Sequence, residues 1–171
     1  MNKRNIAVAT VAALSVAGLG LWGALRLDGN EVGSGEARGT LGTTAASMPS
    51  IEVWKGPRCD CCDKWIEHLQ DAGFDVKVHE VANVAAVKVE KGIPPQLSTC
   101  HTAEVGGYLV EGHVPADAIQ RLLKEKPDVA GLAVPGMPIG SPGMEEPGRP
   151  AERYSVVSFT KDGSVAVFER R

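Results

Sequence analysis

The sequence predicts an α/β domain in which a mixed sheet is flanked by helices and closed by an antiparallel hairpin. From Ile51 onward, β-prone runs alternate with amphipathic helical runs. A strand, a helix and a second strand come first, and this order implies a parallel βαβ unit. Near the end of the chain, residues 161–164 (Lys-Asp-Gly-Ser) separate two β-prone runs, which is typical of a hairpin.

The first half of this domain is predicted to hold two strands and two helices. The expected elements are a strand at 51–54, a helix that Asp60 or Cys61 caps and that extends to about residue 72, a strand at 74–81 and a weaker helix at 84–91. Apolar side chains recur at helical spacing in the first helix, and they alternate in the second strand. Gly73 provides a C-terminal cap for the first helix.

The second half is predicted to hold one helix between strands. The expected elements are a strand at 108–110, a helix at 115–126 and strands at 154–160 and 165–169. Proline in its first turn suits the start of the helix, and Ile119, Leu122 and Leu123 share one face of it. That face is expected to pack on the sheet.

The N-terminus is predicted to be a signal peptide or an N-terminal membrane anchor over residues 1–27. Lys3 and Arg4 precede an uncharged run at residues 5–25, which is long enough to span a bilayer as a helix. A cleaved signal and a retained anchor are both open, and both carry the rest of the chain out of the cytoplasm. We therefore expect a periplasmic protein, either soluble or anchored to the inner membrane through this run alone.

Residues 28–50 are expected to be a flexible linker, because Gly, Ser, Thr and Ala dominate and no apolar periodicity is present. The folded domain is then 51–171. The net charge is −3 and no basic block follows the N-terminus, so nucleic-acid binding is not expected. The chain also has no motif of a P-loop nucleotide hydrolase, a serine hydrolase or a zinc protease.

Four cysteines carry the chemistry of this sequence. Cys59, Cys61 and Cys62 lie close together, and Cys100 is followed by His101. A bridge between neighbouring Cys61 and Cys62 would be strained, whereas Cys59 and Cys62 have ordinary C-x-x-C spacing. The cluster predicts a soft-metal site, a redox site or both. Structural disulfides 59–62 and 61–100 are a third interpretation for an exported protein.

The C-x-x-C spacing falls at the junction of the first strand and the first helix, as in a thioredoxin-like fold. A thiol-disulfide oxidoreductase would use Cys59 as its nucleophile and Cys62 as its resolving thiol. Such an enzyme has no use for a third sulfur between them, so Cys61 favours metal binding over catalysis. A hybrid is also open, in which the same cysteines, joined as a disulfide, accept electrons from a bound metal ion.

Four motifs carry a family resemblance. They are residues 59–65 (Cys-Asp-Cys-Cys-Asp-Lys-Trp), 99–102 (Thr-Cys-His-Thr), 112–116 (Gly-His-Val-Pro-Ala) and 136–144 (Gly-Met-Pro-Ile-Gly-Ser-Pro-Gly-Met). Together they resemble the CopG-type bacterial copper-resistance family, long described as a domain of unknown function, over about residues 51–171. The resemblance implies a thioredoxin-like fold, export from the cytoplasm and a role in copper handling.

Ligand chemistry agrees with copper. Cu(I) is soft and prefers thiolate and thioether, with imidazole as a further choice. Zinc is the main competing metal, but the cysteines of zinc sites usually occur as spaced pairs. The thiolates that hold iron–sulfur clusters are also separated along the chain. The candidate metal ligands are Cys59, Cys61, Cys62, Cys100, His101, His113, Met137 and Met144. The three close sulfurs exceed what one Cu(I) needs, so more than one ion is expected.

The sequence thus predicts an exported copper-binding protein that serves copper tolerance by sequestering Cu(I) or by passing it to other periplasmic copper-handling proteins. The distant candidates should converge on the first three cysteines, because loops at the carboxyl ends of parallel strands meet at one edge of a sheet. Trp54 and Trp65 flank these cysteines and are expected to shield them. His68 and His79 are expected to be surface or packing residues.

Overall fold

The computed structural model describes residues 48–171. The expected leader at 1–27 and nearly all of the expected linker at 28–50 lie outside the described residues, so both stay predictions. Within residues 48–171, no helix combines the length and the apolar character needed to cross a membrane.

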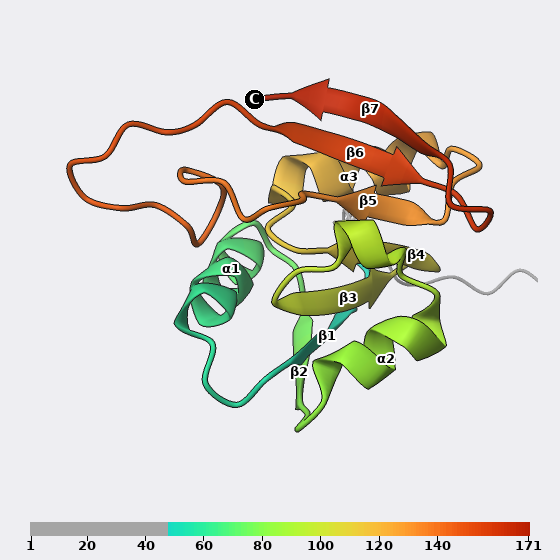
Figure 1. Cartoon of the computed structure of the whole chain (residues 1–171), viewed down its shortest axis with the longest axis horizontal. Helices are drawn as coiled ribbons and strands as arrows, with labels where there is room; N and C mark the ends of the chain where they lie inside the picture. Colours follow the sequence, from blue (N-terminus) through green and yellow to red (C-terminus); the bar gives the residue numbers. More distant parts are fainter. Residues whose placement is uncertain (1–47) are drawn as a thin grey trace, which may run out of the picture. The chain divides into compact units, whose positions relative to one another are not determined.

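A single seven-stranded sheet organises the domain, with the strand order β2-β1-β3-β4-β5-β6-β7 (Figure 1). Its strands are β1 (Ile51–Lys55), β2 (Val76–Glu80), β3 (His101–Val105), β4 (Tyr108–Glu111), β5 (Gly131–Ala133), β6 (Ser155–Phe159) and β7 (Val165–Arg170). The pairs β1–β2 and β4–β5 are parallel, and the other neighbours are antiparallel. The predicted mixed sheet and its closing hairpin, β6–β7, are confirmed.

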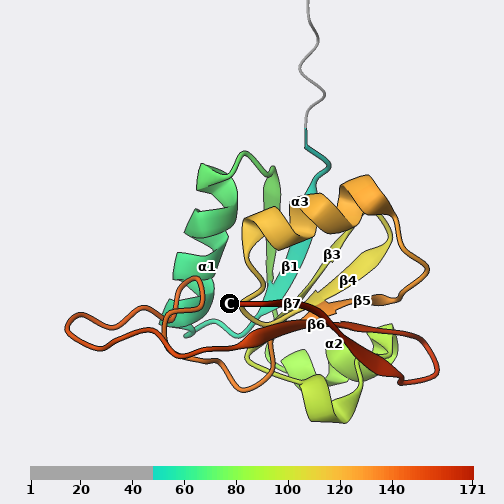
Figure 2. The same ribbon diagram turned by 90° about the horizontal axis from the view of Figure 1, so that it is seen from above.

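Helices cover both faces of this sheet. They are α1 (Asp60–Asp71), α2 (Val84–Lys91) and α3 (Ala116–Glu125), with a short 3-10 turn, η1 (Pro95–Leu97). Figure 2 shows α1 and α3 on one face and α2 on the other. The helices bury the central strands of the sheet, whereas the edge strands β2 and β7 are mostly exposed.

The helix ends differ from the sequence prediction in one respect. Asp60 or Cys61 was expected to cap α1, but Cys59 holds the N-cap position and its side chain makes no capping hydrogen bond. A cysteine sulfur is a weak acceptor, so the first turn of α1 keeps amide groups that no side chain satisfies at the cap. Gly73 follows the helix with φ of 90°, as a C-terminal glycine should.

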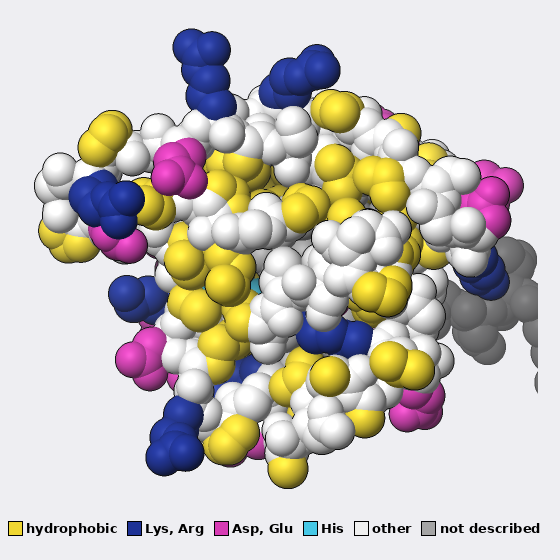
Figure 3. Space-filling model, in the orientation of Figure 1, with side chains coloured by type: hydrophobic (Ala, Val, Ile, Leu, Met, Phe, Trp, Pro, Cys, Tyr) yellow, Lys and Arg dark blue, Asp and Glu magenta, His cyan; other side chains and the backbone are white. Residues whose placement is uncertain are grey.

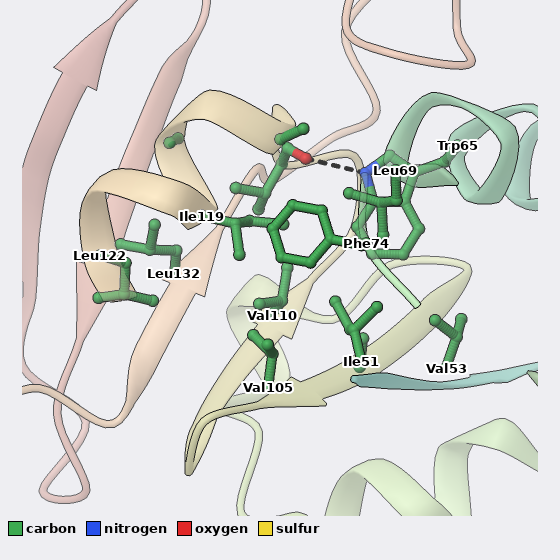
Figure 4. Close-up of a cluster of buried hydrophobic side chains, with 14 of the residues drawn as sticks. Ile51, Val53, Trp65, Leu69, Phe74, Val105, Val110, Ile119, Leu122 and Leu132 are labelled. Atoms are coloured by element: carbon green, nitrogen blue, oxygen red, sulfur yellow. Dashed lines mark hydrogen bonds between the residues drawn. The ribbon is translucent and has the colours of Figure 1, made fainter. Parts of the chain in front are cut away.

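The main core lies between the sheet and the α1–α3 layer (Figure 4). Trp65 and Leu69 on α1 and Ile119 on α3 are fully buried there. Trp65 also donates a hydrogen bond from Nε1 to the Val114 carbonyl at 2.8 Å, so it joins α1 to the chain just before α3. A smaller cluster around Phe159 and Leu97 forms on the opposite face.

His68 has a structural role that the sequence prediction did not specify. Its Nε2 accepts a hydrogen bond from the Ala116 amide at 3.0 Å, and the α3 N-cap, Pro115, has no side-chain cap of its own. His68 therefore caps α3 from a different helix.

Replacing His68 with alanine should lower the free energy of unfolding by about 1 kcal/mol, the usual cost of losing a helix cap. Urea denaturation would measure this change. Gln70→Ala on the same helix is the control, because Gln70 is exposed and should change stability little. Equal effects of the two replacements would contradict the capping role.

Candidate metal centre

Three segments of the chain meet at one edge of the sheet. Lys55 ends β1 and pairs in register with His101, the first residue of β3. The segment that follows β1 therefore runs beside the segment that precedes β3. These segments carry Cys59 and Cys100, respectively. β4 ends at Glu111, next to the start of β3, and His113 follows two residues later.

Four sulfur atoms gather at this edge, and we call Cys59, Cys61, Cys62 and Cys100 the four-sulfur group. All four lie within 4.8 Å of one another. Cys59 and Cys62 form a disulfide, while Cys61 and Cys100 are free thiols. The Cys61 sulfur is 3.7 Å from that of Cys59 and 4.0 Å from that of Cys100. The expected approach of Cys100 to the first three cysteines is therefore present.

A second donor set shares one of these sulfurs, and we call Cys100, His101 and His113 the Cys-His-His group. The Cys100 sulfur is 3.3 Å from Nδ1 of His101 and 3.3 Å from Nε2 of His113. Both imidazoles are fully buried. The structure thus brings together six of the eight predicted ligand residues.

Backbone carbonyls orient both histidine rings. Nε2 of His101 lies 3.1 Å from the Gly112 carbonyl, and Nδ1 of His113 lies 2.8 Å from the Pro142 carbonyl. A carbonyl only accepts, so these two nitrogens carry the hydrogens. The remaining nitrogen of each ring then points its lone pair at Cys100. One thiol hydrogen cannot satisfy two lone pairs, whereas a metal ion can, and carbonyl-oriented histidines are typical metal ligands.

Burial sets the protonation of the group. It lowers the pKa of His101 well below its ordinary value, with the charge of neighbouring His113 acting in the same direction. Burial likewise lowers the pKa of His113. Both imidazoles are therefore neutral at pH 7, the form that binds metal. Burial, followed by the neighbouring Cys61, raises the pKa of Cys100 to about 12, so metal binding must displace its proton.

One of the two tryptophans expected to shield the cysteines lies at the centre. The Trp65 ring packs on His101 with a centroid distance of 4.3 Å, and Trp65 is fully buried. Trp54 instead stacks on His79 at 5.1 Å, and the Lys91 ammonium lies 3.8 Å from its ring centroid. Successive residues of β1 face opposite sides of the sheet, and Trp54 faces the α2 side, away from α1 and the cysteines.

The long segment between β5 and β6 lies against the centre at one point. Gly143 contacts the first turn of α1 so closely that a Cβ there would be 2.7 Å from the Cys61 carbonyl oxygen and 2.9 Å from the Trp65 nitrogen. Met144 is therefore next to the centre in the chain, and it is half-buried. Met137 is 38% exposed. Neither methionine belongs to the hydrophobic core, and metal ligation by either stays a prediction.

A buried ion pair behind the centre was not predicted from the sequence. Lys88 on α2 contacts the Glu111 carboxylate at 2.5 Å, with side chains only 5% and 0% exposed. No motif marks this pair. The available signal was a charged residue directly after the apolar run at 108–110, a position where a solvated loop residue is the ordinary expectation.

Solved structures with this architecture identify the family. Two structures described as "Copper resistance protein copG", Form 1 and Form 2, are each 44% identical to the chain. Each match covers 72% of this chain and 98% of the other, with a TM-score of 0.68. The chain belongs to the CopG family of copper resistance proteins. The predicted family is thereby confirmed.

A family model also matches the part of the chain that carries the metal centre. A family model described as "Protein of unknown function, DUF411" matches residues 97–144, which include the whole Cys-His-His group. No protein with a curated description matches the chain significantly. Membership of the CopG family, together with a cysteine cluster able to hold a metal ion, assigns the chain a copper-related role.

Proposed function

We propose that the protein binds Cu(I) outside the cytoplasm, holds more than one ion at the metal centre, and serves copper tolerance by sequestration or transfer. One observation carries this proposal. Cys100 belongs to both the four-sulfur group and the Cys-His-His group. A shared thiolate can bridge two soft metal ions, so the two groups together suit a small copper cluster rather than one isolated ion.

The surroundings of the centre favour a soft, weakly hydrated ion. His101 and His113 are fully buried, and Trp65 closes one side. Lys and Arg side chains are scattered on the face drawn in Figure 3 rather than gathered into one patch. The donors nearest the centre are sulfur and imidazole nitrogen, which suit Cu(I) better than the hard cations that prefer oxygen.

The disulfide decides how many sulfurs are available. With Cys59 and Cys62 joined, only the thiols of Cys61 and Cys100 can bind a metal as thiolates. Reduction frees two more sulfurs within the same 4.8 Å set. Full copper loading therefore requires the reduced protein.

We expect the reduced protein, loaded without oxygen, to bind more than one Cu(I) per chain and to prefer copper to zinc. Titration with Cu(I) in the presence of a competing chelator would give the stoichiometry and the affinity. The oxidised protein is the matched control and should bind fewer ions. A single tightly held zinc that copper cannot displace would overturn the proposal.

A thiol-disulfide oxidoreductase is the second candidate, and the Cys59–Cys62 disulfide at the start of α1 is the observation in its favour. Cys61→Ser separates the two functions. It should cut copper loading sharply, because one sulfur of the four-sulfur group is lost, while leaving disulfide exchange by Cys59 and Cys62 nearly unchanged. Insulin reduction and copper loading should be measured on both proteins. Insulin reduction by both, with copper loading unaffected by the replacement, would favour the enzyme.

Export is part of the proposal and rests on the uncharged run at residues 5–25. Cell fractionation of the full-length chain tests it. Periplasmic or inner-membrane protein supports export, and the apparent mass distinguishes a cleaved signal from a retained anchor. Recovery in the cytoplasm would overturn this part of the proposal without touching copper binding.

A further inference from the structure

A buried ion pair lies directly behind the copper ligands. The Lys88 ammonium donates to the Glu111 carboxylate at 2.5 Å and to the His101 carbonyl at 2.6 Å. The same carboxylate oxygen accepts from the amide and the hydroxyl of Thr99, at 2.6 and 3.0 Å. One ion pair thus holds the residue before Cys100 and the residue after it.

Stability alone does not explain such a pair. Removing two charges from water is costly, and apolar side chains of similar size usually stabilise a buried position as well or better. The second carboxylate oxygen of Glu111 is buried without a hydrogen-bond partner, so the pair is not even fully satisfied. Burial lowers the pKa of Lys88, and Glu111 opposes that change.

Position in the chain gives the pair another role. Glu111 is the last residue of β4, and Gly112 and His113 follow it directly. Gly112 supplies the carbonyl that faces His101, and there is no room around it, since a Cβ would lie 2.7 Å from the Thr99 hydroxyl. The ion pair therefore ties together the two short segments that carry the Cys-His-His group.

We propose that the Lys88–Glu111 pair is a positioning device that fixes the Cys-His-His group before copper arrives. This inference rests on the proposed copper-binding function. The pair touches no ligand atom of the three residues. It acts through the backbone of Thr99 and His101, and it keeps the free imidazole nitrogens aimed at the Cys100 sulfur.

The test replaces both charges, because a single replacement would leave the other charge buried and could unfold the protein. Lys88→Met/Glu111→Leu should bind Cu(I) about 10- to 100-fold more weakly than the wild type, the usual loss when a residue supporting a metal ligand is removed. Glu111→Gln in the Lys88→Met background restores an acceptor for Thr99 and should recover part of that affinity. Wild-type affinity in Lys88→Met/Glu111→Leu would overturn the proposal.

A neighbouring ion pair provides the matched control. Lys91 on α2 and Glu104 on β3 form an ion pair at 2.7 Å, and neither hydrogen-bonds to a residue of the Cys-His-His group. Lys91→Met/Glu104→Leu should therefore leave the Cu(I) affinity unchanged. An equal loss in both double variants would mean that removing any ion pair between α2 and the sheet has the same effect, and would overturn a specific positioning role.

A second measurement needs no copper. Nitrogen-15 NMR of the metal-free wild type should show one tautomer for each ring, with hydrogen on Nε2 of His101 and on Nδ1 of His113. Lys88→Met/Glu111→Leu should show mixed tautomers. If the wild type binds no Cu(I), the proposed function fails, and this measurement still decides the positioning role: unchanged tautomers in the variant would overturn it.

Discussion

Serine in place of Cys100 should remove more copper than serine at any other cysteine. Cys100 is the residue that the two donor groups share, so its loss takes a sulfur from each at once. We expect the affinity for any copper that the variant still binds to fall by more than about 100-fold. Loss of a residue that only supports a ligand costs up to about 100-fold, and Cys100 is proposed to be a ligand itself. Elemental analysis after gel filtration would give the number of ions per chain.

Cys61→Ser is the matched control for this prediction. Cys61 is free and half-buried like Cys100, but it belongs to the four-sulfur group alone. The Cys61→Ser variant should bind fewer copper ions than the wild type, while its Cys-His-His group still binds copper. Equal residual loading in the two variants would show that Cys100 has no bridging position.

The second large effect is expected at Gly143. Alanine there would place its Cβ 2.7 Å from the Cys61 carbonyl oxygen and 2.9 Å from the Trp65 nitrogen, and neither backbone atom can turn aside. The segment must then move away from α1, which removes the Pro142 carbonyl from His113. We expect a loss of about 1–3 kcal/mol in unfolding free energy from the overlap, in addition to the cost of the backbone angle.

Gly148→Ala isolates the overlap from the backbone angle. Gly148 lies in the same segment with φ of 81°, close to the 84° of Gly143, but a Cβ there would contact nothing within 4 Å. Both variants force an alanine into a left-handed backbone conformation and lose stability for that reason. Only Gly143→Ala should also weaken Cu(I) binding. Urea denaturation and chelator competition measure the two effects, and identical behaviour of the two variants would refute the contact.

Much of the fold could be predicted because its helices and most of its strands have strong local patterns. Two strands were missed for identifiable reasons. In β3, Ala103 and Glu104 are poor strand formers, and Val105 is its one large apolar residue. β5 begins with Gly131, normally a strand breaker, yet any Cβ there would lie 2.0 Å from the Leu109 carbonyl.

The site was predictable in composition but only partly in geometry. Topology placed His113 near Cys59, because β1 and β4 run in the same direction and their carboxyl ends meet at one edge of the sheet. Cys100 reaches the same edge for a different reason, since it precedes β3, which is antiparallel to β1 and was not predicted. The C-x-x-C spacing favoured the pairing of Cys59 with Cys62, but spacing could not show that Cys61 and Cys100 stay free. A relation such as the Lys88–Glu111 contact depends on packing between elements, and no local sequence pattern encodes it.

The separation of the donors along the chain has a consequence for the order of folding. Cys59, Cys61 and Cys62 are close as soon as α1 forms, whereas the Cys61–Cys100 contact spans 39 residues and the His113–Pro142 contact spans 29 more. Contacts of long sequence separation form late, because loop closure must precede them. A chain that has folded only through β2 offers copper its thiols alone. The imidazole donors arrive with β3 and β4, and the segment around Pro142, whose carbonyl orients the His113 ring, comes last.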